Sequence, residues 1–187
     1  MERSIEDKTI LDVFVEDFAR VVEHHCMYVI VSGFIAIAHG RSRGTEDIDM
    51  IIEKLDKESF ISLHEDLLHH GFVCVQSDDP LKLFTLYLQA GMSIRYTRGP
   101  EFFPPEMEVK FVKDVLDEAT LRERTKLPLS GLDVWFARIE TAIAFKEELL
   151  KTDKDMEDAR HLRIIYKESL SPAVIEHTKQ EIQRVRL

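Results

Sequence analysis

The sequence predicts an α/β (α+β) fold, in which a small mixed β-sheet is flanked by helices and followed by a helical C-terminal part. Three observations lead to this class. Short runs typical of strands alternate with longer runs of helical spacing up to residue 137. From residue 138 onward, the apolar residues keep helical spacing only. The composition, with 44% hydrophobic and 32% charged residues, is that of an ordinary soluble globular protein. We therefore expect a core, 1–137, and a helical extension packed on it, 138–187.

The first third of the chain alternates between helix and strand. Apolar residues at helical spacing predict two amphipathic helices, and between them lie an apolar strand, a short helix, a basic loop and a second strand. The expected elements are helix Lys8–Glu23, strand Tyr28–Val31, helix Phe34–His39, a strand carrying Asp47 and Asp49, and helix Leu55–His70.

Short β segments follow in the middle of the chain. Ala90-Gly91 has the length and residue types of a tight hairpin turn between two of them. The expected strands are Phe72–Gln76, Leu83–Gln89, Met92–Thr97, Met107–Lys113 and Leu129–Phe136. A Pro-rich loop, 98–105, interrupts them, and its Phe102 and Phe103 either form a stacking platform for a base or close the edge of the core.

Helices dominate the rest. A charged helical connector is expected at Val115–Lys126, and three more helices follow, at Arg138–Lys151, at Asp153–Tyr166 and from Pro172 onward. Acidic residues open the second of these, as helix N-termini prefer.

Charge and targeting signals restrict the function classes. The net charge of −10 and the pI near 5.3 argue against a general, electrostatically driven nucleic-acid binder, although Arg41 and Arg43 leave room for a local basic patch. Cys26 and Cys74 each lie in or beside an apolar run and are expected to be buried free thiols. Without a signal-like N-terminus or an apolar run of membrane-spanning length, the sequence predicts a cytoplasmic protein.

The residues that indicate a chemical function are Asp47 and Asp49 on one predicted strand and the turn at Ser32 and Gly33 that follows the strand before it. Side chains two apart in a strand share a face, so these carboxylates lie together and repel each other unless a cation joins them. Hard oxygen ligands suit Mg²⁺ or Mn²⁺. Ser32 and Gly33, at the preceding turn, are small enough to let the backbone approach a phosphate. A phosphate-binding turn beside metal-binding carboxylates is the arrangement that phosphoryl or nucleotidyl transfer requires.

The segment SGFIAIAHGRSRGTEDID resembles the signature of the nucleotidyltransferase superfamily of the DNA polymerase β type. That signature is a hydrophobic strand, a Gly-Gly or Gly-Ser pair, a spacer and Asp-x-Asp in a second strand. The similarity is greatest to small prokaryotic minimal and abortive-infection toxin-type members. Ser32 replaces the first small Gly, and its hydroxyl can still donate to a phosphate.

The resemblance implies a nucleoside triphosphate (NTP) substrate and a divalent metal held by Asp47 and Asp49. The superfamily usually adds a third carboxylate from a neighbouring strand, for which Glu108 is the best placed candidate. Two alternatives stay open: Glu108 is a surface residue paired with Lys110, or the neighbouring strand is SIRYT, which offers Arg95 in place of an acid.

The same motif assigns roles to the loop before the second strand. Arg43 would stabilise charge on the leaving pyrophosphate, and Thr45 would orient the loop through a side-chain hydrogen bond to the backbone.

A second block, IETAIAFK followed by KDMEDARHL, resembles the C-terminal half of the toxin-type enzymes. The resemblance implies that Lys146 contacts the nucleotide phosphates and that Asp158, with Asp155 as the alternative, completes the acidic site. The competing interpretation is a helix-surface lysine beside the acid cluster of a helix N-terminus.

Three functions follow from these patterns. The first is a metal-dependent nucleotidyltransferase that moves a nucleoside monophosphate from an NTP to an RNA, protein or small-molecule hydroxyl. The second is a catalytically weak or inactive toxin–antitoxin or regulatory module that keeps the fold and binds a partner protein such as a cognate antitoxin. The third is a nucleotidyltransferase of the antibiotic-adenylating kind.

Overall fold

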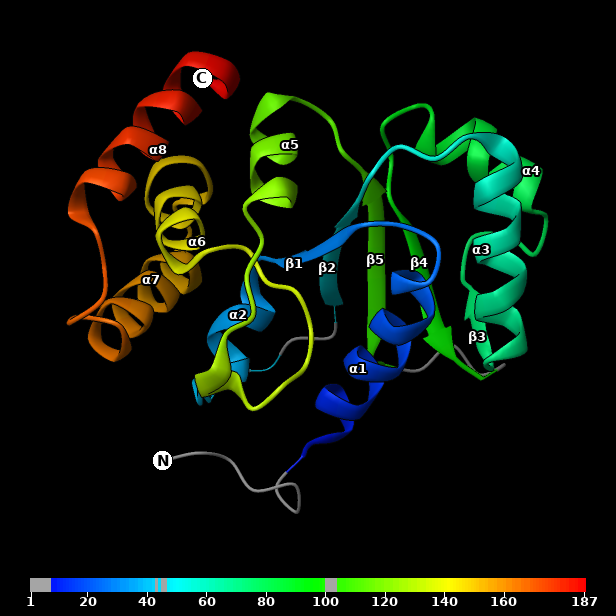
Figure 1. Cartoon of the computed structure of the whole chain (residues 1–187), viewed down its shortest axis with the longest axis horizontal. Helices are drawn as coiled ribbons and strands as arrows, with labels where there is room; N and C mark the ends of the chain where they lie inside the picture. The colour runs from blue at the N-terminus through cyan, green and yellow to red at the C-terminus, as the bar shows by residue number, and fades with distance from the viewer. Residues whose placement is uncertain (1–7, 43, 45–46, 100–103) are drawn as a thin grey trace.

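The computed structural model describes residues 8–42, 44, 47–99 and 104–187 (Figure 1). Five strands form one mixed sheet in the order β1-β2-β5-β4-β3. β2 and β5 run parallel, and the other neighbours are antiparallel. The strands are β1 Tyr28–Val31, β2 Asp47–Ile52, β3 Phe72–Cys74, β4 Ile94–Arg98 and β5 Glu106–Phe111. This mixed architecture confirms the predicted fold class.

Helices lie around this sheet, and most begin at a side chain that caps them. Thr9, Asp56, Asp114, Thr152 and Ser171 each accept a hydrogen bond from the backbone of the first turn that follows. The α-helices are α1 Ile10–Glu23, α2 Gly33–Ala38, α3 Lys57–His69, α4 Pro80–Lys82, α5 Val115–Arg122, α6 Ile139–Phe145, α7 Asp153–Ile165 and α8 Pro172–Arg186. Among the described residues, two π-helical segments, η2 Leu83–Leu88 and η4 Lys146–Leu150, and one 3₁₀ turn, η3 Pro128–Ser130, make up the rest of the helical structure.

The two faces of the sheet differ in chemistry. Along β5, buried and half-buried side chains alternate, as a strand with one covered face requires. The buried face packs on α1 and α3: the Phe18 ring lies 5.0 Å from that of Phe72, and the Phe60 ring lies 6.5 Å from that of Phe111. The opposite face carries Asp47 and Asp49 of β2, Arg95 of β4, and Glu106, Glu108 and Lys110 of β5.

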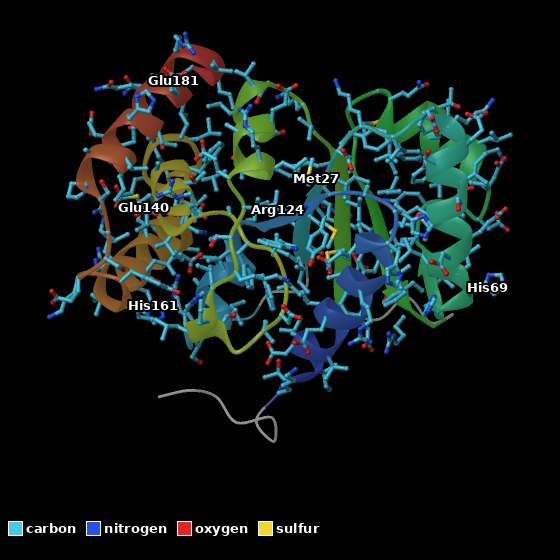
Figure 2. The ribbon with its side chains drawn as sticks, viewed as in Figure 1. Met27, His69, Arg124, Glu140, His161 and Glu181 are labelled. Atoms are coloured by element: carbon cyan, nitrogen blue, oxygen red, sulfur yellow. The ribbon has the colours of Figure 1, made fainter. Side chains whose placement is uncertain are left out.

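The helices α5 to α8 gather on the other side of the molecule, to the left of the sheet in Figure 1. The chain before α6 ties them to the sheet edge, since Ile30 exchanges backbone hydrogen bonds of 2.8 and 2.9 Å with Trp135 and Ala137. Arg124, labelled in Figure 2, donates to the Tyr28 carbonyl at 3.0 Å. The C-terminal helices are therefore built onto the edge formed by β1.

One predicted hairpin is wrong. Most of the first expected strand, Leu83–Leu88, forms η2, which continues α4, and Met92 donates its backbone N–H to Tyr87 across the bend. Aromatic and β-branched residues favoured a strand in isolation, but Asp79 caps the preceding turn and Pro80 occupies its first position, so the segment starts and continues as helix.

A second predicted strand, 129–136, is also wrong for most of its length. The 3₁₀ turn η3 occupies its beginning, and only Phe136 makes bridges, to Ile30 and Thr125.

Two smaller expectations concern the thiols and the membrane. Cys26 and Cys74 are buried free thiols, as predicted, and burial raises the pKa of the Cys26 thiol to about 12. Among the residues that the structure describes, none of the helices combines the length and the apolar character that crossing a bilayer requires.

Candidate active site

The site begins at the turn between β1 and α2. Val31, the last residue of β1, lies opposite Asp49 in the antiparallel register, so Ser32 and Gly33 follow directly beside that carboxylate. Ser32 has φ +67° and ψ −142°, a conformation that costs a non-glycine residue of order 1–3 kcal/mol. Its hydroxyl hydrogen-bonds the Asp49 carboxylate. The strained turn therefore aims the serine side chain at the candidate metal ligand.

Asp49 is a half-buried carboxylate in a charged neighbourhood. Burial raises the pKa of its carboxyl above the ordinary value, and the Glu108 and Asp47 carboxylates act in the same direction. The Ser32 hydroxyl and the Lys110 ammonium oppose them. Without a further cation, the surroundings of Asp49 therefore disfavour the ionised form of its carboxyl group.

The parallel pairing of β2 with β5 places Glu108 directly beside Asp49 and Glu106 beside Asp47. β5 is therefore the neighbouring strand of β2, and SIRYT lies one strand further out. Arg95, however, reaches across from β4 and binds Glu108 with its Nε at 3.2 Å and Nη2 at 3.0 Å. The ion-pair partner of Glu108 is consequently Arg95 and not Lys110.

A cavity of about 190 Å³ opens next to Asp49, between the charged face of the sheet and the helices α5, α6 and α8. Its apolar wall includes Ile35, Ile51 and Phe145. Its polar lining includes Ser32, Asp49, Lys110, Thr120, Thr141 and Lys146. A cavity of this volume accommodates a single ring system.

Lys146 lies in the wall of this cavity with 1% of its surface exposed. Its ammonium donates to Asp158 at 2.8 Å and to Asp155 at 3.2 Å. Asp158 is fully buried and also accepts from Arg41, which follows α2. The residues singled out by the second resemblance, Lys146 and Asp158, thus form a buried ionic cluster that joins η4, α7 and the end of α2. Asp158 does not line the cavity.

The far wall of the cavity is fastened by Arg186 at the end of α8. Its guanidinium binds Asp114 at 2.9 Å through two nitrogens and Asp117 at 2.5 Å. The same guanidinium carbon lies 5.1 Å from the centre of the Phe145 ring. The end of α8 is thereby held against the start of α5.

Two predicted site residues, Arg43 and Thr45, lie outside the described residues, as do Phe102 and Phe103. From sequence, Arg41 was considered only for a local basic patch, and neither Arg186 nor Lys110 was given a role at the site. Lys110 was open to inference because it follows Glu108 by two residues on a strand, which places both on one face. The partners of Arg41 and Arg186 are 117 and 72 residues away along the chain, and no local pattern reveals such contacts.

The described residues supply some, but not all, of the ligands that a divalent metal needs. In the described part of the chain, no three His, Cys, Asp or Glu side chains come together as a ready metal site. Asp47 and Asp49 nevertheless supply carboxylate oxygens on one face, and Mg²⁺ commonly needs only one or two carboxylates besides phosphate oxygens and water. The disfavoured ionisation of Asp49 is also what a cation would relieve.

Comparison with solved structures identifies the fold of this chain. No protein-family model matches the sequence, and no curated protein is similar to it in sequence. Among solved structures, the antibiotic-resistance factor ANT(2″)-Ia superposes with a TM-score of 0.55 at 16% identity, over 93% of this chain and 91% of that one. An antigenic nucleotidyltransferase-like protein from Paracoccidioides brasiliensis superposes with a TM-score of 0.57 at 15% identity, over 99% of this chain and 91% of that one. The chain therefore has the fold of the nucleotidyltransferase superfamily, as predicted.

Proposed function

We propose that this protein is a metal-dependent nucleotidyltransferase that moves a nucleoside monophosphate from an NTP to a hydroxyl group. The observation that carries the proposal is the position of Asp49, which faces a cavity, shares its strand face with Asp47 and is touched by the Ser32 hydroxyl. The nucleotidyltransferase fold agrees with this assignment.

The chain's own residues have distinct roles in the proposed reaction. Asp47 and Asp49 would hold Mg²⁺ or Mn²⁺, which when bound neutralises phosphate charge and activates an attacking hydroxyl. Ser32 and Gly33 would receive phosphate oxygens through the serine hydroxyl and the backbone. Arg43 would act on the leaving pyrophosphate, and Thr45 would fix the loop.

Three predicted site residues have other partners in this structure. Glu108 is bound by Arg95, and Lys146 is bound by Asp158 and Asp155. For Lys146 and Asp158 we favour a role in holding the cavity wall, because each neutralises the charge of the other. A contribution of Glu108 to the metal would require the Arg95 ion pair to open.

The acceptor is proposed as an RNA, protein or small-molecule hydroxyl. One of the structural neighbours, ANT(2″)-Ia, was solved in complex with adenylyl-2″-tobramycin, superposing with a TM-score of 0.53 at 16% identity. Adenylyl-2″-tobramycin is a nucleotidylated small molecule, so an aminoglycoside such as tobramycin belongs in the acceptor panel beside RNA and protein.

The proposal is tested by incubating the protein with each labelled NTP, Mg²⁺ and total RNA, total protein or aminoglycosides. The variant Asp47→Asn/Asp49→Asn should lose transfer by about 10³-fold, which corresponds to several kcal/mol of transition-state stabilisation. A matched control, Glu65→Gln/Glu118→Gln, removes two carboxylates from exposed helix positions and should transfer like wild type. Transfer by the Asp47/Asp49 variant at the wild-type rate would show that the assigned site is wrong.

One observation favours a second candidate, a partner-binding toxin–antitoxin or regulatory module with weak or no catalysis. The candidate third carboxylate is already engaged by Arg95, and so the acidic site lacks a free third acid from β5. A thermal-shift titration with Mg²⁺ and each NTP separates the two functions, because a protein that works only by binding a partner should show no metal-dependent or nucleotide-dependent shift.

A further inference from the structure

Three cationic side chains line the cavity beside Asp49, and they differ in what neutralises them. Lys146 is bound by two carboxylates, and Arg186 is likewise bound by two. The third cation, Lys110, makes no ion pair or side-chain hydrogen bond with any other residue that the structure describes; its electrostatic interaction is with Asp49. The cavity therefore contains one ammonium group that is available to a ligand.

The strand register explains the position of Lys110. It lies on β5 opposite Ile51, two pairs beyond the pair of Asp49 and Glu108, and therefore on the same face. The side chain is half-buried, so its charge is less screened than on an open surface. Arg95 holds Glu108, the nearest acid on the same strand, and so Glu108 does not neutralise the lysine.

We propose that Lys110 is the phosphate-binding cation of this site, and that it contacts an anionic oxygen of the triphosphate. This inference rests on the proposed nucleotidyltransferase function. It assigns the phosphate contact to the lysine on β5 beside the carboxylates and not to Lys146. A lysine is suited to this role because its ammonium is a compact point charge on a flexible stem, able to follow a phosphate.

Lys110 interacts with Asp49 in this structure and would gain a phosphate oxygen as a second partner in the proposed complex. Without a ligand, it compensates the charge of Asp49. A divalent cation held by Asp49 would supply that compensation in its place and would leave the Lys110 ammonium available to a phosphate oxygen. Ser32 and Lys110 would then approach the phosphates from β1 and β5, on either side of Asp49.

The test is calorimetric titration of the full chain with inorganic tripolyphosphate in the presence of Mg²⁺, which reports phosphate binding without depending on the base or on turnover. Lys110→Gln should weaken binding about tenfold, the size expected for one charge-assisted hydrogen bond. Lys110→Arg should stay within about threefold of wild type because the positive charge is kept. The matched control Lys113→Gln removes an exposed lysine just beyond the same strand and should bind like wild type.

The possible outcomes separate the role of Lys110 from the proposed function. Binding by Lys110→Gln as tight as wild type would overturn the assignment of Lys110 while leaving the proposed function intact. An equal loss in Lys113→Gln would also overturn it, because the effect would then be one of overall charge. No tripolyphosphate binding by wild type would overturn the proposed function together with this inference. Thermal melting of each variant in the absence of ligand checks that the fold is retained.

Discussion

Asp49 and Asp158 are both buried or half-buried carboxylates in motif-like segments, yet the chain surrounds them in opposite ways. Asp158 is fully buried and bound by the ammonium of Lys146 and the guanidinium of Arg41. Asp49 faces a cavity, and burial, together with the Glu108 and Asp47 carboxylates, raises the pKa of its carboxyl. Two of the protein's own cations bind Asp158, whereas the pKa of Asp49 stays raised despite the Lys110 ammonium and the Ser32 hydroxyl, so a bound cation would stabilise its ionised form.

The difference shows how to separate a structural acid from a candidate catalytic one. A carboxylate whose partners are the chain's own cations holds elements together, as Asp158 joins α7 to η4 and to the residues after α2. A carboxylate placed beside other acids at a cavity costs stability in the free protein. Sequence motifs alone do not distinguish the two, because both appear as an Asp in a favourable context.

The largest effect should come from breaking the structural cluster. Asp158→Asn leaves Arg41 and Lys146 without their shared countercharge, and removing one partner of a buried ion pair costs about 3–5 kcal/mol. The free energy of unfolding, measured by urea denaturation, should fall by that amount. Glu157→Gln is the matched control: this acid also pairs with Arg41 but its side chain is 59% exposed, so its loss should cost less than about 1 kcal/mol. Equal costs for both variants would contradict the distinction.

The opposite sign is expected at the other carboxylate. Asp49→Asn should raise the free energy of unfolding of the metal-free protein at neutral pH, because it removes a charge that burial and neighbouring acids disfavour. The same substitution should abolish nucleotide transfer.

The pH dependence of this gain has a definite direction. The pKa of Asp49 is raised in the folded state, so the folded protein retains this proton more strongly than the unfolded chain does. The wild type therefore loses stability as pH rises through that pKa, while the Asn variant does not. The difference between the two in urea denaturation should grow from acidic to neutral pH and disappear where the Asp49 carboxyl is protonated. A variant less stable than wild type at neutral pH would contradict the assignment.

The smallest predicted effect concerns Glu108 and its ion pair with Arg95. Arg95→Gln should free this carboxylate beside Asp49 and increase the affinity for Mn²⁺ by about fivefold, roughly 1 kcal/mol, in an electron paramagnetic resonance titration. The stability cost should stay below about 1 kcal/mol, since the Arg95 side chain is 43% exposed. Arg98→Gln, on the same strand and paired with Asp17, provides the control. An unchanged Mn²⁺ affinity would mean that Glu108 does not reach the metal even when released.

Local patterns predicted the sheet well where period and composition agreed. The alternation of β5 placed Glu108 and Lys110 on one face, and the structure confirms this. The adjacency of β5 to β2 was one of two alternatives that the resemblance left open, and the register decides for it. Local patterns failed at residues 83–89, where strand-favouring side chains outweighed the helix-start signals Asp79 and Pro80 in the sequence reading.

The ionic partners at the site could not be predicted in the same way. Arg95 meets Glu108 because β4 pairs with β5, and Arg41 meets Asp158 because α2 and α7 pack together. Such contacts arise from tertiary packing, and no periodicity encodes them. A lysine or an aspartate can therefore be located on an element from sequence, while its countercharge is known only from the fold.

The π-helical segment η4 has a consequence for how this protein tolerates changes in length. Lys151 donates its backbone N–H to Lys146, five residues earlier, so this turn contains one residue more than an α-helical turn. Deleting Glu148 would remove this extra residue and leave a regular helix, with the residues after it on the same face as before. Leu149 and Leu150, which line the cavity, would therefore keep their places, and the strands bearing Asp47 and Asp49 would be untouched. A deletion from the regular helix α6 would instead rotate every helical residue after it by about 100°. The π-helical segment is thus the place in this wall where the chain can lose one residue and keep the cavity beside the carboxylates.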